Sequence, residues 1–163
     1  MKNIKRTSLV LTIFSLFLCL TTVAQAQGKA TLINKYCPQT TKELQKRIKS
    51  VKKVHKGMYN GIFSPLSSSH IDRYNRHVNI LEGNLDREVQ LMKGLLEKAE
   101  QQGRKCQEMA QGLSPHIDKI HGTQTRLHAA IFDSNTIKYK KLIEKLGGEV
   151  KDISGELEKH LVH

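Results

Sequence analysis

The 163-residue chain contains no tryptophan, and aromatic residues make up only 5% of it. Large aromatic side chains dominate the cores of many globular proteins, so a thick core of that kind is not expected. No run of four to eight residues alternates apolar and polar side chains as half-buried strands do. The apolar residues are instead leucine, isoleucine, valine and methionine at helical spacing, which predicts thin, packed helices rather than a sheet.

Motifs of the common enzyme classes are also absent. The chain has no G-x-S-x-G, no H-E-x-x-H and no glycine-rich phosphate loop. Eight histidines are many for this length, but no two stand in an H-x-x-x-H pair. Glu82, Asp86 and Glu88 are interpreted as members of ion pairs on an exposed helix face rather than as acid–base catalysts. We therefore expect no catalytic residues, no metal site and no cofactor.

Residues 1–26 have the pattern of a secretory signal peptide. Three cations in the first six residues precede an apolar run over 9–23, and a small-x-small cleavage site ends at Ala26. The run is shorter than the roughly 20 apolar residues of a membrane-spanning helix. We expect cleavage before Gln27 and export to the periplasm or the exterior. The alternatives are a retained anchor and lipidation of Cys19, which the bulky preceding leucine disfavours.

The net charge of the full chain is +12, and loss of residues 1–26 would lower it to +9. Such a surplus attracts anionic partners but gives no information about the fold. Lipid headgroups, lipopolysaccharide, acidic proteins and nucleic acids all carry suitable charge. Export disfavours nucleic acid among them.

Cleavage would remove Cys19 and leave Cys37 and Cys106. Two cysteines in an oxidising compartment predict one disulfide bond. The alternative is a pair of buried or intermolecular thiols. A bond would close a loop of about 70 residues, which stabilises the fold by roughly 4 kcal/mol in the chain-entropy model.

Apolar residues recur at steps of three and four from about residue 44 onward, the spacing of one helix face. Glycine, proline and serine clusters then predict helices over 37–60, 71–110 and 115–132. Asp133-Ser134-Asn135 is either a break or a helix cap, and the apolar face continues beyond it to a hinge at Gly147-Gly148, before a last helix. The second helix would be the longest, with a heptad-like apolar seam through which copies of the chain could oligomerise.

The predicted fold class is all-α. We expect an elongated helical bundle built on a long antiparallel helical hairpin with coiled-coil-like packing. Residues 27–163 would form a single domain, in which 149–163 could pack as a separate C-terminal helix.

A row of lysines in the first helix is the best candidate for a contact surface. Its members recur at steps of four, three, four and three: Lys42, Lys46, Lys49, Lys53 and Lys56. A cationic helix face can bind an anionic bilayer surface. The alternative interpretation is the solvated outer face of a bundle helix.

The sequence therefore predicts an exported, non-enzymatic binding or interaction protein of the bacterial periplasm or exterior, whose basic surface contacts an anionic or protein partner. Two alternatives stay open. Size, basicity and helical hairpins are similar to those of periplasmic holdase chaperones, although no strands are found here for the small β body of that class. The third class is an accessory subunit of an envelope or secretion assembly.

Overall fold

The computed structural model describes residues 36–63, 71–132 and 136–161, and its regular secondary structure there is entirely helical. The predicted signal peptide, its cleavage site and Cys19 lie outside the described residues. The four helices are α2 (Pro38–Phe63), α3 (Ile71–Glu100), α4 (Arg104–Phe132) and α5 (Thr136–Lys159). The prediction of an all-helical bundle is confirmed.

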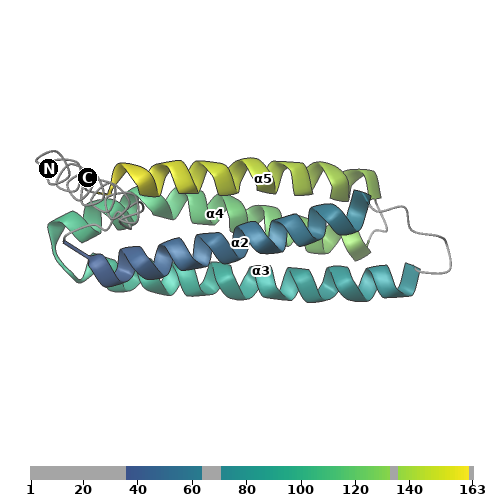
Figure 1. Ribbon diagram of the computed structural model, residues 1–163, viewed down its shortest axis with the longest axis horizontal. Coiled ribbons are helices and arrows are strands. Elements are labelled where there is room, and N and C mark those ends of the chain that lie inside the picture. The colour runs from purple at the N-terminus through teal and green to yellow at the C-terminus, as the bar shows by residue number, and fades with distance from the viewer. Residues whose placement is uncertain (1–35, 64–70, 133–135, 162–163) are drawn as a thin grey trace, which may run out of the picture. The chain divides into compact units, whose positions relative to one another are not determined.

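Each helix packs against two others. The contacting pairs are α2 with α3, α3 with α4, α4 with α5, and α5 with α2, so the four helices enclose one core (Figure 1). Every helix contributes a fully buried leucine to this core: Leu44, Leu85, Leu113 and Leu146. Burial of one such side chain stabilises the fold by about 1.5–3 kcal/mol.

The contacts between α2 and α3 follow a consistent order along the two helices. Arg47 lies 3.4 Å from Glu88. Further along α2, a Cβ atom at Gly57 would meet Leu81 of α3, and one at Gly61 would meet His77. Later residues of α2 thus meet earlier residues of α3.

The prediction of one continuous helix over 71–110 is wrong. α3 ends at Glu100 and α4 begins at Arg104. Between them Gly103 has a φ of 105°, in the left-handed region that glycine adopts without steric penalty. The apolar spacing continues across this turn because both helices face the same core, with Ala99 and Cys106 buried on either side of it. Periodicity alone therefore does not reveal the turn.

The stop predicted at Gly112, before a new start at Pro115, is also wrong, because α4 runs through both residues. Proline in a helix interior removes one backbone hydrogen bond. Pro115 is exposed, so water can satisfy the carbonyl that has lost its partner. Burial of Leu113 and Ile117 on either side favours continuation of the helix.

The break predicted at Gly147-Gly148 is likewise absent, and α5 runs across both glycines. A Cβ atom at Gly147 would lie 2.9 Å from the imidazole ring of His55 on α2. The Nε2 atom of that ring lies 3.0 Å from the Ile143 carbonyl oxygen. A Cβ atom at Gly148 would meet nothing within 4 Å. Gly147 therefore marks a close approach of α2 and α5 rather than a hinge.

Alanine substitutions should separate these two glycines. Gly148→Ala should raise the free energy of unfolding by about 0.5–1 kcal/mol, because alanine is the better residue in a helix interior. Gly147→Ala should lower it, because the added methyl group has to displace the His55 ring. Urea denaturation followed by circular dichroism measures both values. Equal stabilisation by the two variants would contradict the contact between α2 and α5.

Candidate binding surface on α2

The five lysines predicted as a contact surface, called here the lysine stripe, all lie exposed on α2. They are Lys42, Lys46, Lys49, Lys53 and Lys56. The apolar positions between them, Leu44, Ile48 and Val51, are at most 4% exposed. One face of α2 is thus fully used by the core, and the opposite face presents the lysines.

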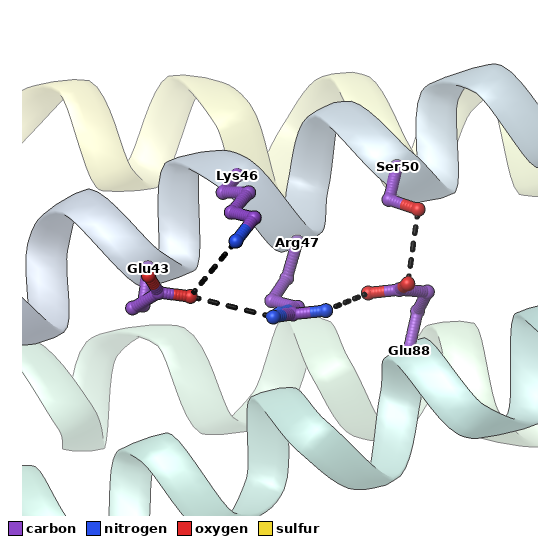
Figure 2. Close-up of polar contacts among 5 residues, drawn as sticks. All are labelled: Glu43, Lys46, Arg47, Ser50 and Glu88. Atoms are coloured by element: carbon purple, nitrogen blue, oxygen red, sulfur yellow. Dashed lines mark hydrogen bonds and ion pairs between the residues drawn. The ribbon is translucent and has the colours of Figure 1, made fainter.

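The charge of α2 is unusually one-sided, with seven lysines and arginines and a single acidic residue, Glu43. Arg47 reaches Glu43 at 3.4 Å and Glu88 of α3 at the same distance. The hydroxyl of Ser50 donates to the second oxygen of Glu88 at 3.0 Å (Figure 2). Arg47 is only 23% exposed and is paired with Glu88 of α3, so its charge is not part of the stripe.

The lysine stripe itself is hardly neutralised. Among the described residues Lys42, Lys49, Lys53 and Lys56 have no ion pair, and Lys46 has only a 3.9 Å contact with Glu43. Some cations on other helices are closely paired, as Lys105 is with Glu108 at 2.8 Å and Lys159 with Glu156 at 2.6 Å. Like charges three or four residues apart destabilise a helix. An anionic partner would relieve this repulsion.

The acidic residues of α3 were expected on an exposed face, and for Glu82 this is wrong. Glu82 is 3% exposed, and its Oε2 atom lies 3.3 Å from Nδ1 of His128 on α4. Burial raises the pKa of Glu82, while His128 and the nearby Tyr139 of α5 act in the opposite direction. Its spacing from buried Val78 and Leu85 already placed Glu82 on the core side, a signal that sequence reasoning missed.

A groove between α3 and α4 lies over Glu82. His121 and His128, which are seven residues apart in the sequence, both line it, together with Asp86, Gln124 and Thr125. His121 is also 3.3 Å from the Nζ atom of Lys93. In the part of the chain that the structure describes, no cluster of three or more histidine, cysteine, aspartate or glutamate side chains could hold a metal ion.

The pKa of Glu82 leads to a prediction about pH. Because the folded pKa exceeds that of the unfolded chain, stability from this group is fully present at low pH and is lost as pH rises through the folded pKa. The Glu82→Gln variant has no titratable group at this position, so it does not lose this stability as the pH rises. The free energy of unfolding of the variant, minus that of the wild type, should therefore grow between about pH 4 and pH 7.

Urea denaturation across this pH range measures the difference. Glu97→Gln, at an exposed position of the same helix, controls for the loss of one negative charge. A difference that is independent of pH would contradict the raised pKa of Glu82.

Cys37 and Cys106 are brought together at one end of the bundle, where both are buried free thiols. Burial and, to a smaller extent, the adjacent Cys106 side chain together raise the pKa of Cys37 to about 12, against a small opposite effect of a hydrogen bond with Thr41. A thiol with this pKa is protonated at neutral pH and is a poor nucleophile. The disulfide between Cys37 and Cys106 stays a prediction.

The disulfide can be tested by intact mass. In protein purified from the exported fraction, alkylation without reduction should modify neither cysteine, and alkylation after reduction should modify both. Cys37→Ser or Cys106→Ser should then lower the free energy of unfolding by about 2–5 kcal/mol. Two thiols that react in unfolded but unreduced protein would contradict the bond.

None of the described helices contains a stretch long and apolar enough to cross a membrane. Comparison with protein-family models, with curated proteins and with solved structures finds no match to this chain.

Proposed function

We propose that this chain is an exported, non-enzymatic helical binding protein of the bacterial periplasm or exterior, and that the lysine stripe contacts an anionic or protein partner. The observation that carries the proposal is the exposure of five lysines that have almost no compensating acids around them. The buried face of the same helix holds this row in a fixed orientation, so the charges act together.

The solvated outer face of a bundle helix is the competing interpretation. Such a face commonly mixes acids and bases, since pairs at three and four residues then stabilise the helix. α5 fits that description, with five acidic residues among its six lysines. α2 has one acidic residue against seven bases, which favours a binding role for this helix in particular.

The runner-up function is that of a holdase chaperone, which would need accessible apolar surface for unfolded clients. The large apolar side chains exposed in the described part of the chain are spread over three helices and their ends. They are Tyr36, Tyr59, Ile80, Leu91 and Ile137. Because these side chains do not form one continuous apolar surface, they support a binding protein over a holdase chaperone.

An accessory subunit that oligomerises through the 71–110 seam is the third candidate. Leu85, Val89 and Met92 of this seam are 0% exposed within a single chain. A second copy could reach them only if the bundle opened, so this route receives less support.

We also propose that α2 and α3 form an antiparallel hairpin with coiled-coil-like packing. The order of the contacts supports it, because residue 47 meets 88 while residue 61 meets 77. Buried residues of α3 at steps of four, three and four, namely Leu85, Val89, Met92 and Leu96, have the spacing that knobs-into-holes packing requires.

Neutralising part of the stripe should weaken partner binding. In the triple variant Lys46→Gln, Lys49→Gln and Lys53→Gln, native pull-down from an envelope extract should recover at least about tenfold less of the partner at 50 mM salt. The difference should shrink at about 300 mM salt, where screening is stronger. The free energy of unfolding should change by less than about 1 kcal/mol, because exposed charges contribute little.

A matched control comes from three exposed lysines on the other helices. The triple variant Lys98→Gln, Lys119→Gln and Lys151→Gln loses the same net charge away from the stripe. It should bind the partner within about threefold of the wild type. Equal losses in the two triple variants, or no loss in either, would contradict a specific role for the stripe.

A further inference from the structure

We infer that the partner of the lysine stripe is the surface of an anionic lipid bilayer, on which α2 lies flat without inserting. This inference rests on the proposed function and adds the class of partner and the mode of contact. Three features of α2 support it. All exposed residues of the stripe segment are lysines, the stripe contains no arginine, and an exposed tyrosine lies near each end of the helix.

The first feature is the uniformity of the exposed residues. Every exposed residue of α2 between positions 42 and 56 is a lysine, since Lys52 is exposed beside the five members of the stripe. The apolar residues of this segment, such as Leu44 and Val51, are buried in the core. Helices that insert into the interface bury an apolar face there. α2 has no such face to offer, so contact with a bilayer would be electrostatic.

The second feature is the use of lysine alone. Arginine binds carboxylates and phosphates through a fixed fork, whereas the lysine ammonium is a compact charge that accepts any direction of approach. The one arginine of α2, Arg47, is held by Glu43 and Glu88. The stripe rises about 21 Å along the helix. Lipid headgroup phosphates move laterally and can approach each lysine from any direction. A row of lysines therefore matches a bilayer surface better than it matches one folded partner, whose acidic side chains have fixed positions.

The third feature is a tyrosine at either end of α2. Tyr36 is 54% exposed and Tyr59 is 41% exposed. Tyrosine combines an apolar ring with a polar hydroxyl and is enriched at the membrane–water interface. Tyr59 lies one turn of helix beyond the last lysine of the stripe, and its ring centroid is 6.1 Å from that of His55. Because His55 contacts α5, Tyr59 lies on the flank of α2 toward α5, where a bilayer in contact with the lysines would meet it at the edge of the contact.

Vesicle sedimentation tests the partner class directly. The natively processed protein should bind phosphatidylcholine vesicles that contain about 30% phosphatidylglycerol and should not bind phosphatidylcholine alone. The stripe triple variant at residues 46, 49 and 53 should bind the anionic vesicles about a hundredfold more weakly at low salt. The control triple variant at 98, 119 and 151 should stay within about threefold of the wild type, and circular dichroism should show both variants folded.

The orientation can be read from a single tryptophan, because the natural chain has none. Emission from Tyr59→Trp should shift to shorter wavelength on anionic vesicles. Emission from Leu91→Trp, at an exposed position of α3, should not. Shifts of equal size in both variants would overturn the flat orientation on α2.

The outcomes also separate this inference from the function on which it rests. Wild-type binding to soluble polyglutamate or to duplex DNA, with none to anionic vesicles, would overturn the bilayer as partner but leave an anion-binding stripe intact. Equal vesicle binding by the two triple variants would overturn the role of the stripe. Vesicle binding that persists without anionic lipid would overturn the electrostatic mode.

Discussion

Burial of one apolar face from each of the four helices against a shared core is the constraint on which this structure depends. Isolated helices of this length are only marginally stable in water, and packing supplies most of their stability. The core alone does not fix the relative positions of the helices along their axes. Each helix pair therefore carries a polar contact: Arg47 with Glu88, Glu82 with His128, Thr123 with Glu149, and His55 with the Ile143 carbonyl. These contacts therefore join residues at matching heights on neighbouring helices.

The same constraint leaves α2 with a surface that the fold itself does not require. Its inner face is buried in the core, its one arginine contacts Glu88 of α3, and the lysines of the stripe make almost no ion pairs with the described residues. The repulsion within the row is small beside the stability from the core, because surface charges are screened by water and salt. The bundle can thus carry a concentrated positive face at little cost to folding, which makes the face available for recognition.

Much of this arrangement could be predicted from the three- and four-residue spacing of apolar residues. That spacing gave the helical class, most of the buried positions and the outward direction of the stripe. Boundaries were less predictable, because a helix interior tolerates a glycine at a penalty of about 1 kcal/mol and neighbouring contacts can outweigh it. Gly147 resembles a hinge in sequence, yet it admits the His55 ring. Gly103 has no distinguishing neighbours in sequence, yet it forms the turn. Glu82 was assigned to the surface by its charge, although its spacing placed it inside.

The one-sided charge of α2 also affects how copies of the chain meet one another. Two molecules that approach through their stripes repel, and such repulsion keeps proteins apart in solution. Negative charge on a shared surface would screen the repulsion and permit neighbours to stand close together. The number of protein molecules per unit area would then depend on the charge of that surface rather than on the concentration of protein in solution. The fold itself would be the same in dilute solution and on such a charged surface.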